Sequence, residues 1–169
     1  MEVRVKSICF VSFLACIFIS STSYSQVGVQ GSQKAADLGK NVYGLGLSAG
    51  PASGIGISFR NHLPSKISYQ IVGGIFKSAD QIWASIGGEF QYDLVRGNTT
   101  RLFVGPSTSY FHKGTGDDEY LAPFRFGLGV GGEINLQNAV NISVEGVFVY
   151  FSNGEILPMP QIGIHYYFY

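Results

Sequence analysis

Residues 122–133 read Ala-Pro-Phe-Arg-Phe-Gly-Leu-Gly-Val-Gly-Gly-Glu, and two kinds of side chain alternate along this stretch. One parity is apolar and the other is charged or glycine: Phe124, Phe126, Leu128 and Val130 against Arg125, Gly127, Gly129, Gly131 and Glu133. Because successive side chains of a β-strand point to opposite faces, this period of two predicts a strand with one apolar face. The glycines also match the dinucleotide-binding pattern GxGxxG, but no helix pattern follows them. We interpret them as small residues on the crowded face of a sheet.

The same alternation recurs from residue 41 to residue 169 and predicts eight strands in all. The apolar parity of the other seven strands consists of Tyr43, Leu45 and Leu47; Ile55, Ile57 and Phe59; Ile67, Tyr69, Ile71 and Ile75; Ile82, Ala84, Ile86, Phe90, Tyr92 and Leu94; Leu102, Val104 and Tyr110; Val140, Ile142, Val144, Phe148 and Tyr150; and Ile162, Ile164, Tyr166 and Phe168. Segments of about 9–11 residues have the length of tilted strands that cross a bilayer.

Short turn signals separate the strands, at residues 50–53, 62–65, 77–80, 96–98, 113–119, 135–138 and 153–158. No link is long enough for a crossover helix, so we expect antiparallel hairpins in sequence order. An even set of eight strands can remove its edges by closing into a barrel. Pro106 falls within a predicted strand, where its missing N–H needs an explanation. We expect a β-bulge at Gly105–Pro106.

Alternation alone also fits a soluble barrel whose apolar face lines a ligand cavity. Composition argues against this alternative, because charged residues are only 13% of the chain, against roughly 25% in soluble domains. Bulky aromatic residues also gather in two groups near the strand ends, as in membrane barrels: Tyr43, Phe59, Tyr69, Phe90, Tyr92, Tyr166 and Phe168 at one rim, and Tyr110, Phe124, Phe126, Phe148 and Tyr150 at the other. The sequence therefore predicts an all-β fold, an eight-stranded antiparallel up-and-down transmembrane β-barrel.

Residues 1–25 have the pattern of a cleaved secretory signal peptide. Arg4 and Lys6 precede an apolar run over residues 8–19, and a polar stretch with small residues follows. The run is too short to span a membrane, which takes roughly 20 residues. Both cysteines lie in this segment. Residues 26–40 are polar, and we interpret them as a periplasmic lead-in to a barrel domain at 41–169.

The signal peptide, the eight alternating strands and the terminal strand Ile-Gly-Ile-His-Tyr-Tyr-Phe-Tyr resemble the small outer-membrane β-barrel proteins of the OmpA/OmpX kind. The resemblance covers residues 41–169 and implies a Gram-negative outer membrane, with both barrel termini in the periplasm and the 113–120 and 152–160 loops outside. It also implies a C-terminal signal that the barrel-insertion machinery reads, here Ile162, Ile164, Tyr166, Phe168 and Tyr169. Lipopolysaccharide and other outer-membrane lipids are the remaining implied partners.

The inward parity carries a set of charged residues, and we expect an interior charge network of Arg60, Glu89, Asp93, Arg101, Arg125, Glu133 and Glu145. An eight-stranded barrel is narrow enough for side chains to fill it. We favour a salt-bridged plug, in which every buried charge has a partner. A gated ion path, in which arginine–carboxylate pairs exchange, is the alternative.

No residue pattern indicates a metal or cofactor site. His62, assigned to a turn, His112, at a strand end, and His165, on an inward face, lack ligand spacing. The acidic run at 117–119 is interpreted as a solvated loop tip, with a divalent cation that bridges lipopolysaccharide phosphates as the alternative.

One stretch resembles a catalytic motif of the lipid A deacylase barrels, His-x-Ser-Asn. In that family the histidine is the base and the serine the nucleophile. Ser152 and Asn153 match here, but Tyr150 stands at the histidine position. Tyrosine, with an ordinary pKa near 10, is a poor base near neutral pH. We interpret the stretch as a turn.

These observations predict a non-enzymatic barrel with a filled interior and no cofactor, which serves envelope structure or surface contact. The alternatives are a narrow porin-like channel and a deacylase-like barrel without its histidine. Basic and acidic residues balance at 11 each, which argues against nucleic-acid binding. We expect a monomer.

Overall fold

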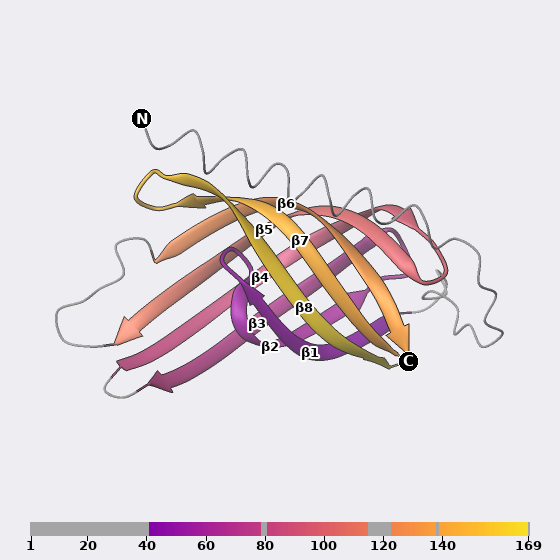
Figure 1. Cartoon of the computed structure of the whole chain (residues 1–169), viewed down its shortest axis with the longest axis horizontal. Helices are drawn as coiled ribbons and strands as arrows, with labels where there is room; N and C mark the ends of the chain where they lie inside the picture. The colour runs from indigo at the N-terminus through magenta and orange to yellow at the C-terminus, as the bar shows by residue number, and fades with distance from the viewer. Residues whose placement is uncertain (1–40, 79–80, 115–122, 138, 169) are drawn as a thin grey trace. The chain divides into compact units, whose positions relative to one another are not determined.

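The computed structural model describes residues 41–78, 81–114, 123–137 and 139–168. Eight strands pair in sequence order and β1 also pairs with β8, so the sheet closes into a barrel (Figure 1). The strands are β1 Val42–Gly50, β2 Gly54–His62, β3 Ile67–Ser78, β4 Gln81–Arg96, β5 Thr100–Gly114, β6 Phe124–Gln137, β7 Val140–Phe151 and β8 Ile156–Phe168. The predicted all-β fold, a closed barrel of eight antiparallel strands in sequence order, is confirmed. The predicted signal peptide at 1–25, the lead-in at 26–40, the acidic run at 117–119 and Tyr169 lie outside the described residues.

Within the described part of the chain, no helix is both long enough and apolar enough to cross a membrane.

Two predicted turns are largely strand in the structure. Residues 135–137, predicted as part of a turn at 135–138, belong to β6. The turn between β7 and β8 occupies residues 152–155, and β8 begins at Ile156, so Ile156–Pro158 belong to a strand rather than to a loop at 153–158. Pro158 lies opposite Phe148 and Pro160 opposite Gly146. The prolines made the predicted start of the strand too late, because proline is avoided in the interior of a sheet but accepted at an edge.

The bulge predicted at Gly105–Pro106 is also wrong. The register of β5 runs unbroken past Pro106 on the β6 side, where Pro106 lies opposite Leu128. On the β4 side the register is the same above and below, and the bulge lies instead between Asp93 and Val95 of β4. A Cβ added at Gly105 would lie 1.7 Å from the carbonyl oxygen of Phe90. Next to Pro106, β5 therefore approaches β4 closely at Gly105, and no extra residue is inserted.

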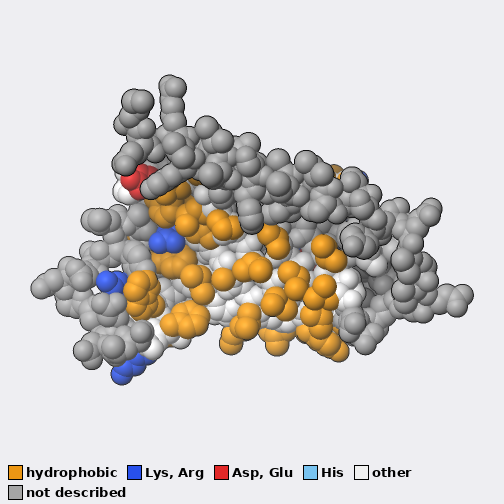
Figure 2. Space-filling model, in the orientation of Figure 1, with side chains coloured by type: hydrophobic (Ala, Val, Ile, Leu, Met, Phe, Trp, Pro, Cys, Tyr) orange, Lys and Arg blue, Asp and Glu red, His pale blue; other side chains and the backbone are white. Residues whose placement is uncertain are grey.

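The two faces of the barrel differ as the alternation predicts. Side chains of the apolar parity are exposed on the outside, among them Leu47 at 64%, Leu128 at 60% and Phe148 at 66%. Figure 2 shows hydrophobic side chains spread over the visible wall. Aromatic rings also contact one another near both ends of the strands. Tyr43 stacks on Phe59 and Phe168 with centroids 6.1 and 6.2 Å apart, and Tyr110 lies 4.9 Å from Phe124.

The turn between β1 and β2 folds into the lumen. These strands have 9 residues each, whereas β4 has 16 and β5 has 15, and Figure 1 shows their turn well short of the neighbouring hairpins. Ala52 is completely buried and packs against Val147 and Val149 of β7. Gln161 of β8 accepts hydrogen bonds from the N–H groups of Ala52 and Ser53 at 3.1 and 3.0 Å. Residues 51–53, here called the plug turn, therefore close the lumen from within.

The alternating glycines of β6 make room for this filling, as the sequence predicted. A Cβ at Gly127 would lie 2.6 Å from Ala52 Cβ, and one at Gly129 would lie 2.1 Å from the Glu145 carboxylate. A Cβ at Gly131 would meet the ring of Phe103 at 2.6 Å. Gly132, on the opposite parity, has only the Arg101 carbonyl oxygen at 3.8 Å. The glycines thus mark the inward face of a closely packed lumen.

We expect Gly127→Ala to destabilise the barrel, because its new methyl group overlaps Ala52 and Val147; overpacking of this kind costs about 1–3 kcal/mol. The free energy of unfolding, measured by urea titration in detergent micelles, gives the comparison. Gly132→Ala, in the same strand with its methyl group in open space, serves as the control. Equal stability of the two variants would contradict the inward position of Gly127.

Candidate functional site

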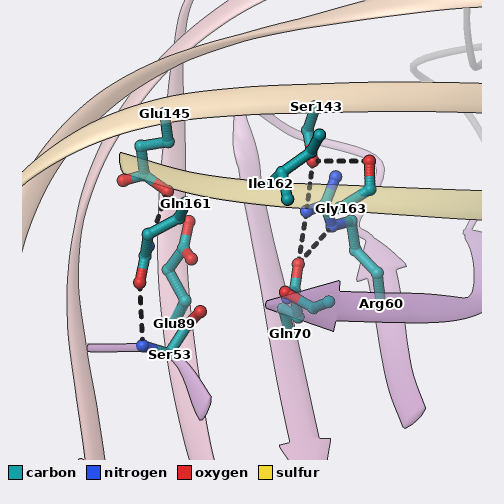
Figure 3. A pocket seen from close by; sticks show the side chains of 10 residues that line it. Ser53, Arg60, Gln70, Glu89, Ser143, Glu145, Gln161, Ile162 and Gly163 are labelled. Carbon is teal, nitrogen blue, oxygen red and sulfur yellow. Dashed lines mark hydrogen bonds between the residues drawn. The ribbon is translucent and has the colours of Figure 1, made fainter. Parts of the chain in front are cut away.

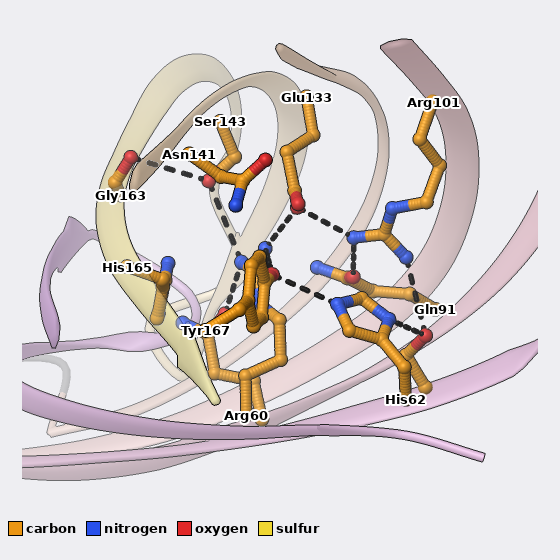
Figure 4. Close-up of polar contacts among 12 residues, drawn as sticks. Arg60, His62, Gln91, Arg101, Glu133, Asn141, Ser143, Gly163, His165 and Tyr167 are labelled. Atoms are coloured by element: carbon orange, nitrogen blue, oxygen red, sulfur yellow. Dashed lines mark hydrogen bonds and ion pairs between the residues drawn. The ribbon is translucent and has the colours of Figure 1, made fainter. Parts of the chain in front are cut away.

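An ionic cluster of five side chains fills one part of the lumen, and Figure 4 shows Arg60, Arg101 and Glu133 of this cluster. Glu133 of β6 accepts hydrogen bonds from two guanidinium groups on the same oxygen: Arg60 of β2, and Arg101 of β5 at 2.8 Å. Arg101 also pairs with Asp93 of β4 at 2.8 Å, and Arg96 pairs with the second oxygen of Asp93. Arg60, Asp93, Arg101 and Glu133 are all buried. Charges of both signs therefore neutralise one another in the interior.

Neutral polar side chains lie beside this cluster and accept hydrogen bonds from several of its remaining donors. Gln70 accepts from Arg60, and Gln91 accepts from Arg101 at 2.6 Å. Arg60 also donates to the Tyr167 hydroxyl at 3.3 Å. Satisfaction of the remaining donors matters because the desolvation of a buried guanidinium is costly unless its N–H groups find acceptors.

His62 belongs to this polar layer, and its predicted place in a turn is wrong. It is the last residue of β2 and is buried, with Nδ1 2.6 Å from Ser68 Oγ and Nε2 2.8 Å from the Tyr167 hydroxyl. His165 lies on the inward face of β8, as predicted, and hydrogen-bonds Ser58 at 2.8 Å. Both histidines therefore act as hydrogen-bonding side chains of the filled lumen.

The register explains why residues so far apart in sequence meet. Arg60 lies opposite Gln70, Gln70 opposite Glu89, and Arg101 opposite Glu133 in neighbouring strands. Arg60 on β2 reaches Glu133 on β6, four strands further around the closed barrel. This ion pair therefore joins opposite walls across the lumen.

A carboxyl pair lies beside the ionic cluster. Glu89 accepts a hydrogen bond from Gln91 at 2.5 Å, and Glu145 accepts one from Gln161 at 3.0 Å. Both carboxyl groups line a small cavity with Arg60, Gln70 and Ser143 (Figure 3). Its volume is about 10 Å³, which is close to the least that can hold one water molecule. The space here suits a bound water rather than a solute.

The predicted interior charges fall into three places. Arg60, Asp93, Arg101 and Glu133 form the ionic cluster, and Glu89 and Glu145 form the carboxyl pair. Arg125 lies with the plug turn: its guanidinium is 3.9 Å from the Phe111 ring centroid and 5.1 Å from that of Phe151, and it donates to the Pro51 carbonyl at 3.4 Å. The bond to Pro51 fastens the plug turn.

Sequence reasoning missed one charged member of the cluster, Arg96. The register shift between Asp93 and Val95 reverses the parity of β4, so that Val95 is exposed and Arg96 pairs with Asp93. An uninterrupted alternation assigns Arg96 to the outer face. The alternation could have identified Gln70, Gln91 and Tyr167 as members of the polar interior, because each lies at an inward position of its strand.

The stretch that resembles a deacylase motif forms a turn. Ser152 and Asn153 are exposed, and Asn153 hydrogen-bonds the side chain of Glu155 at 3.1 Å and its N–H at 3.2 Å. Tyr150 is on the outer face and is 45% exposed. Among the residues that the structure describes, no three His, Cys, Asp or Glu side chains form a group that could hold a metal ion.

We expect Glu133→Gln to destabilise the barrel, because Arg60 and Arg101 lose the carboxylate that they share; removal of one partner of a buried ion pair costs about 3–5 kcal/mol. Urea unfolding followed by the fluorescence of the single tryptophan gives the measurement. Glu155→Gln, in the exposed turn, is the matched control and should leave the transition unchanged. A Glu133→Gln transition at the wild-type position would show that the cluster contributes nothing to stability.

No protein-family model matches the sequence, and no curated protein matches it. Among solved structures, the outer membrane protein Ail of Yersinia pestis, determined in a phospholipid bilayer nanodisc, is similar to this chain with 10% sequence identity and a TM-score of 0.49. The similarity covers 77% of this chain and 99% of Ail.

Proposed function

We propose that the protein is a non-enzymatic outer-membrane β-barrel with a closed, side-chain-filled interior, serving envelope structure or surface contact. The observation that carries the proposal is the reversed distribution of polarity: the ionic groups are buried in the lumen, and large apolar side chains cover the outside. A soluble barrel has the opposite arrangement, because exposed apolar patches in water promote association. A bilayer is the solvent that suits this exterior.

The filled lumen supports a structural role over transport. The cross-lumen pair between Arg60 and Glu133 and the plug turn obstruct the interior at two different levels. A continuous path would require the rearrangement of both. A structural or surface-contact role therefore fits this interior better than a narrow channel does.

The proposed partners follow from the exterior and from β8. Outer-membrane lipids, including lipopolysaccharide, would contact the apolar wall of a monomeric barrel. The barrel-insertion machinery would read the outward residues of β8, where Ile162, Ile164, Tyr166 and Phe168 are all exposed. Export through a cleaved signal peptide at 1–25 is part of the same proposal.

We expect Leu128→Arg to weaken folding into phospholipid vesicles by about 2–4 kcal/mol, because the guanidinium would face hydrocarbon near mid-strand. Val95→Arg is the control. Val95 is also exposed, but lies near the strand end beyond the bulge, where a charge costs only about 0–1 kcal/mol. Urea titration of vesicle-bound protein measures both. Equal effects would argue that no bilayer surrounds the exposed apolar side chains of the outer face, here called the apolar belt.

We expect the purified protein to show no steady conductance in planar bilayers, because the plug turn and the ionic cluster fill the lumen. Heat-modifiable gel migration of the same sample, boiled against unboiled, confirms that the barrel is folded. A steady single-channel current from the folded sample would favour the narrow channel instead.

We also expect lipid A from cells that express the protein to keep its mass, because Ser152 has no histidine at the position expected for its base. Mass spectrometry of extracted lipid A gives the measurement, with cells that carry an empty vector as the control. A mass loss equal to one acyl chain, abolished by Ser152→Ala, would establish an enzyme.

A further inference from the structure

The barrel wall is incomplete in the half that lies away from Val42 at the start of β1 and Phe168 at the end of β8. Pairing between β1 and β8 ends at Ala49 opposite Ile162, although β8 continues to Ile156. Pairing between β2 and β3 ends at Ile57 opposite Gly73, although β3 continues to Ser78. Among the described residues, β3 beyond Gly73 and β8 before Ile162 are thus each paired on one side only. We call the gap between these two segments the side notch.

Sequence and register agree on this gap. Both prolines of β8, Pro158 and Pro160, lie in the segment that is paired only with β7. Proline lacks the N–H that a second neighbouring strand would use, so it is tolerated at a sheet edge and avoided in a central strand. The segment of β8 that pairs with both β1 and β7, from Ile162 onward, contains no proline. The edge is therefore encoded in the sequence.

Inward-facing apolar side chains become accessible beside the side notch. Phe76 of β3 and Leu157 of β8 share the parity of residues buried in the lumen, Val72 and Gln161, yet they are 49% and 46% exposed. Met159 packs against the buried cluster of Ala52, Val147 and Val149. Trp83 lies opposite Phe76 in the register, with the Lys113 ammonium 5.5 Å from its ring centroid. The inner surface at the notch is thus apolar and aromatic.

The outer surface beside the side notch belongs to the apolar belt. Ile75 on β3 is 78% exposed and Ile156 on β8 is 64% exposed, and both lie on the outward face. Exposed apolar side chains therefore flank both edges, with Ile75 and Ile156 outside and Phe76 and Leu157 inside. If the belt lies in a bilayer, acyl chains are the molecules that adjoin the opening.

The two edges of the side notch differ in the backbone hydrogen-bonding groups that they present to a bound molecule. The β8 edge offers little hydrogen bonding, because its prolines have no N–H. The β3 edge keeps the backbone groups that point away from β4, and such groups are costly without partners in hydrocarbon. An acyl chain with a carbonyl linkage at its polar end presents apolar surface to β8 and acceptors to β3. A second protein strand would be blocked on the β8 side.

We propose that the side notch binds the acyl chain of a membrane lipid, which enters sideways between β3 and β8 and packs on Phe76 and Leu157 above the plug turn. This inference rests on the proposed function, because it requires the apolar belt to lie in a bilayer. It adds a lipid-binding site on the inner surface of a barrel whose lumen is otherwise filled.

Trp83 makes the site directly testable, because it is the single tryptophan of the chain. The full chain is reconstituted in vesicles of phosphatidylcholine whose acyl chains carry bromine, a quencher that acts at short range. We expect Trp83 to lose fluorescence to nearly the same extent as a tryptophan on the outer wall, Ile162→Trp in a Trp83→Phe background. Phe111→Trp in the same background is the control for an inward-facing residue on the closed wall, and should be quenched severalfold less.

Two results would overturn the proposal. Quenching of Trp83 no greater than that of the Phe111→Trp control would show that acyl chains do not enter. Quenching unchanged by Leu157→Glu, in a sample that remains folded by heat-modifiable migration, would show that the quencher acts through the wall. The Ile162→Trp variant separates the two hypotheses: if it is not quenched, the barrel does not lie in the bilayer and the proposed function fails, whereas its quenching with an unquenched Trp83 rejects the side notch alone.

Discussion

One carboxylate, Glu133, holds two guanidinium groups from different walls of the barrel, and the packing of the lumen depends on it. The constraint arises because a barrel with an apolar exterior must place its polar side chains inside, where few water molecules fit. Each charge then needs a partner within reach, or its desolvation is uncompensated. Arg60 and Arg101 meet this requirement by sharing Glu133, and the glutamines beside them accept from the donors left over.

Residue size is the second half of the same constraint. The inward glycines of β6 lie where Ala52, Glu145 and Phe103 would otherwise collide with a side chain. A narrow lumen therefore alternates large ionic groups with positions that carry no side chain at all. The lumen is also graded along its length, from the ionic cluster through the carboxyl pair to the apolar contacts of the plug turn. No single layer accounts for the closure of the barrel.

Much of the fold could be predicted from the sequence, because a period of two over eight segments determines both the strands and their faces. Predictions failed where a local irregularity broke that period. The bulge beside Asp93 turned Arg96 inward, and the prolines of β8 concealed the beginning of a strand. The inward fold of the plug turn has no signature in its own residues, because it depends on Gln161, Gly127 and Val149 from distant strands. Residue pairs across the lumen, such as Arg60 and Glu133, likewise depend on a register that alternation does not specify.

The position of the plug turn ties the closing of the lumen to the pairing of the first strand with the last. The plug turn is carried by β1, which completes the barrel by pairing with β8, and the last residue pair of that seam, Ala49 with Ile162, adjoins Gln161, which holds the plug turn. These contacts join residues more than 100 positions apart in sequence, and such distant contacts are slow to form because a long chain segment must first be ordered. Completion of the seam and closure of the lumen by the plug turn therefore depend on neighbouring residues of β1 and β8.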